Sequence, residues 1–127
     1  MMRSPLDGLK VLELARVLAG PWAGQLLADL GAEVIKVESP IGDETRKWGE
    51  DSFNNNSSYF KCTNRGKSSF VANFKKKNEL EMVQHLAKNA DVIIENYKVK
   101  NLKEYKLDYK NIKKINKPII YLSLIHI

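Results

Sequence analysis

The sequence predicts an open α/β sheet, mostly parallel, with helices on both faces. Short apolar runs typical of buried strands recur along the 127 residues, and segments with apolar residues at helical spacing lie between them. Strands that alternate with helices in this way form parallel strand–helix–strand units with right-handed crossovers. The length fits one globular domain with a core of its own and is too short for two.

The first strand–helix–strand unit lies near the N-terminus. LKVLEL (Leu9–Leu14) is its first predicted strand, and AEVIKVE (Ala32–Glu38) is its second. Between them, Gly20 and Pro21 predict a helix start with the proline at the first helical position, where its missing N–H costs nothing. Gly31 can adopt the left-handed conformation that ends a helix. The helix would carry Trp22, Leu26, Leu27 and Leu30.

The middle of the chain predicts one long surface loop, followed by a second strand and helix. Residues 39–69 are rich in Gly, Asn, Ser and charged residues without a sustained period, so we expect a surface loop there. SFVANF (Ser69–Phe74) alternates as a strand does. The following helix would start at Asn78 as its N-cap. One face of this helix carries Leu80, Val83, Leu86 and Ala87.

The C-terminal part continues the alternation. DVIIENY (Asp91–Tyr97) is apolar throughout its middle, as buried parallel strands are. A helix can start at Asp108, where Leu107 and Ile112 have the spacing of a hydrophobic staple. Pro118 then precedes a last strand-like run, IIYLS. Three strand–helix repeats therefore support the predicted sheet.

Composition restricts the partners and the location. The net charge of +6 comes mostly from lysines, at residues 75–77 and 98–117, and could attract nucleic acid, anionic lipid or a phosphorylated small molecule. Because no nucleic-acid motif accompanies the charge and no apolar run could span a bilayer, we expect neither a nucleic-acid nor a membrane partner. The sequence shows no signal peptide. The single cysteine, Cys62, suits a cytoplasmic location, and we expect it to be half-buried and non-catalytic.

Ligands of open α/β sheets bind at the carboxyl ends of the strands, where helix N-termini present unpaired N–H groups. Those ends fall at residues 15–19, 38–46, 74–77 and 96–100. GPWAG lacks the spacing of a dinucleotide fingerprint, and the P-loop signature is absent. For Glu38 and Asp43, near this edge, we expect turn and helix-cap roles. The residues alone thus predict a basic α/β domain with an anion-binding edge and no evident nucleophile.

Several blocks along the chain resemble one family. They are PLDGLKVLEL, RVLAGPWAGQLLADLGAEVIKVE, GDETRKWG, SSYFKCTNRGKSSFVANFKK, ADVIIENY and YKNIKKINKPIIYLS. This succession resembles the amino-terminal part of the class III coenzyme A transferases of the CaiB/BaiF type, which include formyl-CoA, carnitine-CoA and succinyl-CoA–dicarboxylate transferases. The resemblance implies that residues 1–121 are the N-terminal part of a Rossmann-like CoA-binding domain, truncated before that domain is complete.

The resemblance also implies a reaction. Members of the family move CoA from an acyl-CoA donor to a carboxylic acid and assemble as interlocked homodimers. An aspartate carboxylate attacks the thioester to give a mixed anhydride, the CoA thiolate returns to form an enzyme thioester, and the acceptor acid completes the exchange. That aspartate lies well beyond the equivalent of Ile120. We therefore expect no catalytic residue in this chain, no metal site, and no acyl transfer by the chain alone.

By position, the resemblance places CoA contacts at three strand ends. They are Leu18 and Ala19, then Ala72, Asn73, Phe74 and Lys75, and finally Asn96, Tyr97 and Lys98. Two departures concern phosphate. Ser39 stands where the family often has an arginine, and Glu104 replaces another arginine in a segment where Val99, Lys100 and Leu102 align with Pro, Gly and Leu. Losing arginine removes a bidentate phosphate clamp, which Lys98, Lys100 or Lys103 could replace only as point charges.

Two alternatives stay open. One is a 2-methylacyl-CoA racemase, a close relative of these transferases, although the long segment 48–69 resembles the transferases and favours transfer over isomerisation. The other is a free-standing basic nucleotide-binding module without chemistry of its own. A chain that continues into the missing aspartate would separate the enzyme from the binding module.

The last six residues, LSLIHI, have a separate explanation. The same six residues result from translating CTG TCT CTT ATA CAC ATC, which resembles the end of a transposase adapter used in sequencing libraries, and the alternative is a real but divergent strand end. We therefore expect residues 122–127 to be adapter read-through on a truncated gene, and we assign no function to His126.

Overall fold

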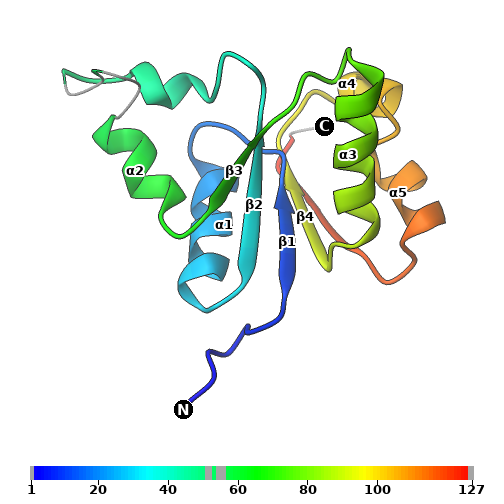
Figure 1. Cartoon of the computed structure of the whole chain (residues 1–127), viewed down its shortest axis with the longest axis horizontal. Helices are drawn as coiled ribbons and strands as arrows, with labels where there is room; N and C mark the ends of the chain where they lie inside the picture. Colours follow the sequence, from blue (N-terminus) through cyan, green and yellow to red (C-terminus); the bar gives the residue numbers. More distant parts are fainter. Residues whose placement is uncertain (1, 51–52, 54–56, 126–127) are drawn as a thin grey trace.

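The computed structural model describes residues 2–50, 53 and 57–125, which form an open parallel sheet (Figure 1). Its strand order is β3-β2-β1-β4-β5, and every pair of neighbours is parallel. The strands are β1 (Lys10–Glu13), β2 (Glu33–Glu38), β3 (Ser68–Val71), β4 (Val92–Glu95) and β5 (Ile120–Ser123). The order reverses at β1, as in a Rossmann-type sheet, so the predicted fold class is confirmed.

Helices cover both faces of the sheet. They are α1 (Ala19–Asp29), the 3-10 helix η1 (Glu44–Lys47), α2 (Ser58–Asn64), α3 (Lys77–Lys88), α4 (Val99–Glu104) and α5 (Tyr109–Ile115). In Figure 1, α1 and α2 lie on one side of the strands and α3, α4 and α5 on the other. The helices η1 and α2 interrupt the predicted surface loop, and α4 was not predicted. With four to seven residues each, they are too short to show a helical period.

Each face of the sheet has an apolar core. Leu12 and Ile93 point toward α3 and α5 and are 2% and 0% exposed. Their strand neighbours Val11 and Ile94 belong to the second core, beneath α1. Strands buried on both faces need apolar residues at successive positions, which explains the continuous apolar runs in the sequence.

Two predicted helix boundaries were wrong. α1 begins at Ala19, so Pro21 is its third residue, where the N–H would also lack an intrahelical partner. α3 begins after Lys76, and Asn78 lies inside the helix. The turn before α3 is held instead by Glu79, whose Oε2 accepts the Asn73 N–H at 2.7 Å. The prediction for Gly31 is confirmed, because its φ is +103°.

Other predictions have mixed outcomes. Leu107 and Ile112 are both fully buried on either side of the N-cap Asp108, as the predicted staple requires. Cys62 is exposed and not half-buried, because it lies on the outer side of the short helix α2. Within the described residues, no helix is long and apolar enough to cross a bilayer.

The end of the chain contains the residues for which adapter read-through is expected. Leu122 and Ser123 belong to β5, and the Leu124 N–H donates to the Glu95 carbonyl at 2.9 Å. His126 and Ile127 lie outside the described residues. The origin of residues 122–127 stays a prediction.

Candidate functional site

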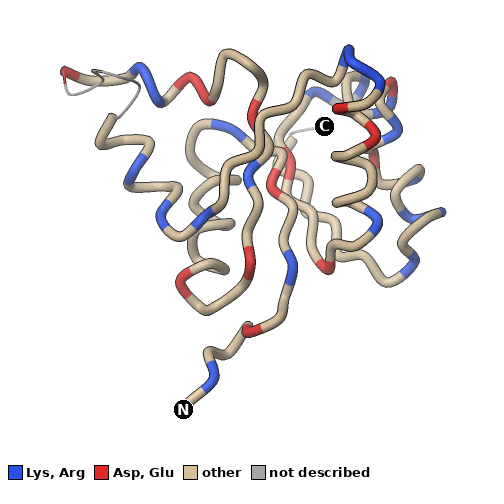
Figure 2. Tube along the Cα trace, in the orientation of Figure 1, with Lys and Arg blue, Asp and Glu red and all other residues tan. Residues whose placement is uncertain are grey.

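A crevice of about 330 Å³ lies at the carboxyl ends of β2 and β3, next to β4. Basic residues gather at this end of the molecule, around the start of α3 (Figure 2). Five lining residues were predicted as ligand contacts, namely Ala72, Asn73, Phe74, Lys75 and Tyr97. The other five were not assigned as contacts: Ser39 and Pro40 fall within the predicted strand end 38–46, and Asn101, Glu104 and Tyr105 lie beyond the predicted strand ends. The strand-end rule therefore located this crevice, and α4 supplies the part that it missed.

Three aromatic side chains give the crevice an apolar wall. The Phe74 ring lies 6.4 Å from the Tyr97 ring and 5.3 Å from the Tyr105 ring, measured between centroids. The Arg16 guanidinium lies 5.6 Å from the Tyr97 ring centroid, within the range of a cation–π contact. Burial raises the pKa of the Tyr97 phenol, so Tyr97 is neutral near pH 7. Such a wall suits a flat aromatic ligand group with a charged part beside it.

The remaining predicted contacts are not in the lining of the crevice. Asn96 binds the backbone of Arg16 twice, since its Oδ1 accepts the Arg16 N–H at 3.0 Å and its Nδ2 donates to the Arg16 carbonyl at 2.7 Å. Leu18 and Ala19 are exposed at the start of α1. Lys98 is the exposed N-cap residue of α4. Asn96 thus ties the end of β4 to the turn that leads from β1 into α1.

That turn contains an unusual backbone conformation. Val17 has a φ of +72°, a region that β-branched residues rarely occupy because the side chain crowds the backbone. Its N–H points to the carboxylate of Asp43, with 3.3 Å between Val17 N and Asp43 Oδ2. The turn is therefore held from two sides, by Asn96 at Arg16 and by Asp43 at Val17.

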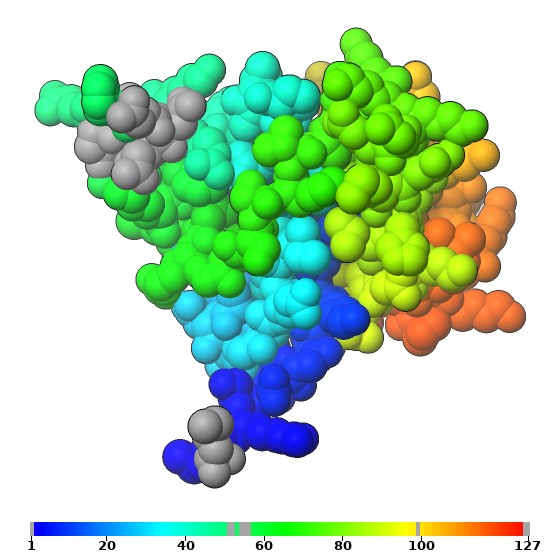
Figure 3. Space-filling view, in the orientation of Figure 1, coloured from blue at the N-terminus to red at the C-terminus, as the bar shows by residue number. Residues whose placement is uncertain are grey.

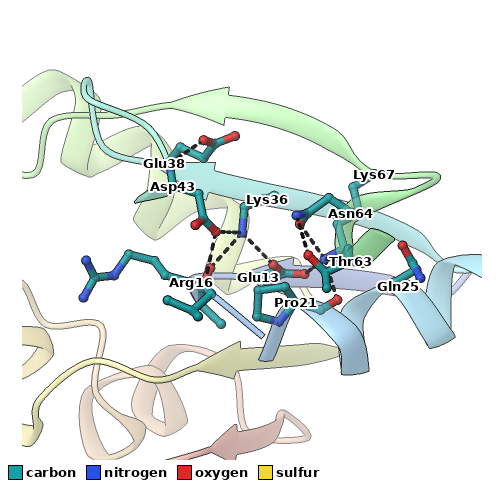
Figure 4. Close-up of polar contacts among 12 residues, drawn as sticks. Glu13, Arg16, Pro21, Gln25, Lys36, Glu38, Asp43, Thr63, Asn64 and Lys67 are labelled. Atoms are coloured by element: carbon teal, nitrogen blue, oxygen red, sulfur yellow. Dashed lines mark hydrogen bonds and ion pairs between the residues drawn. The ribbon is translucent and has the colours of Figure 1, made fainter. Parts of the chain in front are cut away.

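A buried ionic network lies behind the turn (Figure 4). The Lys36 ammonium lies 3.0 Å from Glu13 Oε1 and 3.0 Å from Asp43 Oδ2, and it donates to the Ala15 carbonyl at 2.9 Å. These acceptors use all three protons of the ammonium. Glu13 and Lys36 are register partners in the β1–β2 ladder, so the sheet itself places the two charges side by side.

Lys67 extends the network toward α1 and α2. Its ammonium lies 2.6 Å from Glu13 Oε2 and donates to the carbonyls of Pro21 and Thr63 at 2.7 and 2.8 Å. The Lys67 side chain is 2% exposed, and burial lowers its pKa to about 8 despite the opposing charge of Glu13. Both oxygens of Glu13 therefore face a buried cation.

Asp43 and Glu38 have the predicted turn and cap roles. Asp43 is the N-cap of η1, and its Oδ1 accepts the Thr45 N–H at 3.0 Å. Glu38 Oε2 accepts the Asp43 N–H at 2.8 Å, and Arg46 donates to both oxygens of Glu38. Burial alone would raise the pKa of each carboxyl. Lys36 at Asp43 and Arg46 at Glu38, with the hydrogen bonds, outweigh burial and lower both pKa values.

Comparison with known proteins identifies the family. A family model described as CoA-transferase family III matches residues 6–125. The chain belongs to this family. It is 50% identical to a succinate–glutarate CoA-transferase of Agrobacterium fabrum, over 96% of this chain and 32% of that protein. It is 49% identical to a mouse succinyl-CoA:glutarate CoA-transferase, over 94% of this chain and 28% of that protein.

A solved structure supports the same family. The crystal structure of a CaiB/BaiF family protein from Brucella suis matches with a TM-score of 0.89 and 51% sequence identity, over 96% of this chain and 33% of that chain. The chain thus spans about a third of the length of the relatives that it matches. The Rossmann-type order of its strands is the fold of this part of a family III CoA-transferase.

The two departures from the family pattern both lie in the crevice. Ser39 lines the side next to β2, and Glu104 lines the side formed by α4. Lys75 is the one lysine in the same lining, among the described residues. Within this lining an anionic ligand would therefore meet one lysine and one carboxylate, and the Arg16 guanidinium beside the Tyr97 ring adds a further cation.

Sequence reasoning missed the buried network. Its signal was present, because Glu13 in VLEL and Lys36 in VIKV each have apolar neighbours on both sides, and the two charges are opposite. Buried charges of this kind are expected to be paired. Within the described ranges, no group of three or more His, Cys, Asp or Glu side chains could hold a metal ion.

The low pKa of Lys67 predicts how stability depends on pH. Above pH 8 the native chain releases this proton, whereas the unfolded chain keeps it up to the ordinary pKa near 10.5. The free energy of unfolding should therefore rise between pH 8 and 10, by up to about 1.4 kcal/mol per pH unit. Chemical denaturation at several pH values measures this rise. Lys67→Met should lose it, and Lys61→Met, at an exposed lysine of α2, should keep it. Parallel pH profiles of all three proteins would contradict the prediction.

Proposed function

We propose that this chain is the N-terminal, CoA-binding part of a CoA-transferase that moves CoA from an acyl-CoA donor to a carboxylic acid. The observation that carries the proposal is the crevice at the carboxyl ends of the strands. Five of the nine residues that family resemblance assigns to CoA line this crevice, two more are the chain neighbours of Tyr97, and the last two lie at the start of α1. In an open α/β sheet this is where a nucleotide is expected.

The crevice provides for two chemical parts of CoA. The aromatic wall of Phe74, Tyr97 and Tyr105 offers a stacking surface for adenine. Lys75, at the crevice, and Lys98, at the start of α4, provide positive charge for the phosphates. The start of α1 adds unpaired N–H groups and the positive end of a helix dipole.

For the whole protein we propose the chemistry of the family. An aspartate beyond the matched segment would form the acyl anhydride and the enzyme thioester, without a metal ion. The relatives named above act on succinyl-CoA, succinate or glutarate, so a small dicarboxylic acid is the proposed acceptor. Their names favour transfer over racemisation. We further propose a cytoplasmic homodimer, with residues 1–121 in its CoA-binding domain and residues 122–127 as adapter read-through.

Binding calorimetry with CoA tests the proposal on the 127-residue chain. The chain should bind CoA, and Lys75→Glu should weaken binding by about tenfold, since a charge-assisted hydrogen bond is replaced by repulsion. Lys77→Glu is the matched control. It makes the same change in charge at a fully exposed lysine outside the crevice lining, and it should change the affinity less than threefold.

Two results would contradict the proposal. One is a wild-type chain that does not bind CoA. The other is an equal loss of affinity in both charge variants, which would indicate attraction to the general charge of the protein and not a site. The chain alone should also show no acyl transfer, and turnover above background would contradict the assignment of the nucleophile to a later segment.

A further inference from the structure

The turn between β1 and α1 connects three parts of the candidate site. Arg16, before the strained residue, lies over the Tyr97 ring of the crevice. Leu18, after it, is the N-cap of α1. A change in the backbone of Val17 would therefore move the guanidinium at the aromatic wall and the first amides of the helix together. The conformation of this one residue sets the geometry of that side of the site.

Nothing in the side chain of Val17 favours its conformation. Asn, Asp and Gly occupy the left-handed region far more readily than a β-branched residue does. A residue stays in such a conformation only where the surroundings hold it, and such residues cluster at ligand-binding sites. Asp43 is the side chain that accepts the Val17 N–H.

Asp43 is itself fixed on every side. It is 1% exposed, its Oδ1 accepts both the N–H and the Oγ1–H of Thr45, and its Oδ2 lies 3.0 Å from the Lys36 ammonium. Lys36 is held by Glu13, and Glu13 is held by Lys67. The side chains of Glu13, Lys36, Asp43 and Lys67 are at most 2% exposed, so water does not weaken their contacts (Figure 4). Both oxygens of the Asp43 carboxylate are therefore bound within the network.

We propose that Asp43 is a positioning residue for ligand binding, whose carboxylate holds Val17 in the left-handed conformation and thereby places Arg16 and the start of α1 against the ligand. The inference rests on the proposed function, because CoA is the ligand used to test it. Asp43 does not line the crevice, so it acts through the turn and not by contact with CoA.

Rescue by glycine distinguishes positioning from a general structural role. Without the carboxylate, Val17 can leave the left-handed region, and Asp43→Ala should weaken CoA binding by about tenfold. Glycine occupies that region without strain, so in a chain that carries Val17→Gly the same Asp43→Ala change should cost less than threefold. A loss of affinity that comes from a damaged ionic network would not respond to the residue at position 17.

Lys106 offers a matched control for the glycine. It has a φ of +56° at the end of α4 and is the other described non-glycine residue with a positive φ. Lys106→Gly relieves the same kind of strain away from the turn, so it should not restore the CoA affinity of the Asp43→Ala chain. Equal rescue by both glycines, or no rescue by Val17→Gly, would overturn the proposal.

A measurement without CoA tests the proposal even if a variant does not fold or the wild-type chain does not bind CoA. Nuclear magnetic resonance of the free wild-type chain reports the φ of Val17 through its HN–Hα coupling taken together with the intraresidue HN–Hα NOE, which is strongest at positive φ. Solvent exchange reports whether the Val17 amide is protected. The proposal expects a left-handed φ and a protected amide. An extended Val17 or a freely exchanging amide would overturn it, whether or not CoA binds. If Val17 is held in the wild-type chain and released in Asp43→Ala while CoA does not bind, the proposed function fails and the positioning of the turn by Asp43 stands.

Discussion

Replacing Lys36 by methionine is expected to lower the free energy of unfolding by about 3–5 kcal/mol, because the change leaves buried carboxylates without their cation. Lys36 is 1% exposed, and Glu13 Oε1 and Asp43 Oδ2 each lie 3.0 Å from its ammonium. Methionine has a similar length and fills the space, so the loss reports the charge and not a cavity. Urea denaturation of the wild-type chain and of Lys36→Met measures the difference.

The surface pair between Asp29 and Arg65 is the control for this result. Its closest contact is 2.7 Å, as short as many buried ones, but Arg65 and Asp29 are 65% and 40% exposed. Water screens such a pair, so Asp29→Asn should leave the denaturation midpoint nearly unchanged. A Lys36→Met chain as stable as Asp29→Asn would show that the buried network contributes little to the fold.

Replacing Gly24 by alanine is expected to destabilise the chain by about 3 kcal/mol, although alanine is normally the better helix former by about 1 kcal/mol. A Cβ at position 24 would lie 2.1 Å from Glu13 Oε2, well inside contact distance. The carboxylate has no room to move away, because Lys36 and Lys67 hold its two oxygens. Glycine is thus required for α1 to approach the ionic network.

Leu26→Ala provides the comparison on the same helix. Leu26 is 58% exposed, so its truncation should change the free energy of unfolding by no more than about 0.5 kcal/mol. Urea denaturation again measures both variants. A gain in stability for Gly24→Ala, as helix propensity alone would give, would contradict the close approach of α1 to Glu13.

The fold could be predicted where local pattern and packing agree. All five strands were found, because strands buried on both faces require continuous apolar runs, and Gly31 indicated the end of the first helix. The starts of two helices were predicted wrongly. Asn78 has the composition of an N-cap, but the Asn73–Glu79 hydrogen bond fixes the turn earlier and α3 begins at Lys77. A side-chain contact between residues six apart leaves no periodic signal.

Only part of the candidate site could be predicted from the sequence, for a different reason. The strand-end rule located Phe74, Lys75 and Tyr97, since it depends only on strand order, and the family resemblance added Ala72 and Asn73. Tyr105 and Asn101 reach the crevice through α4, a helix of six residues that propensity does not reveal. The link from Asp43 to Val17 depends on a backbone angle, which composition does not encode.

A second cavity in the structure is an alternative place for a ligand. It has a volume of about 530 Å³ and lies beside α3, lined by residues such as Ile35, Phe70 and Met82. This cavity is lined by residues of β2 and β3 on one side and of α3 on the other. In Figure 3, α3 is yellow-green and lies beside the cyan residues of β2 and the green residues of β3. The cavity is larger than the crevice but lies away from the carboxyl ends of the strands, so the strand-end rule does not favour it.

Chemical-shift mapping of the isotope-labelled chain during titration with CoA locates the CoA site. Binding in the crevice predicts saturable shifts at the amides of residues 72–75, 96–98 and 16–19, with Met82 and His85 unchanged. Shifts concentrated at Met82 and His85, or shifts spread over all exposed lysines without saturation, would contradict a CoA site at the carboxyl ends of the strands.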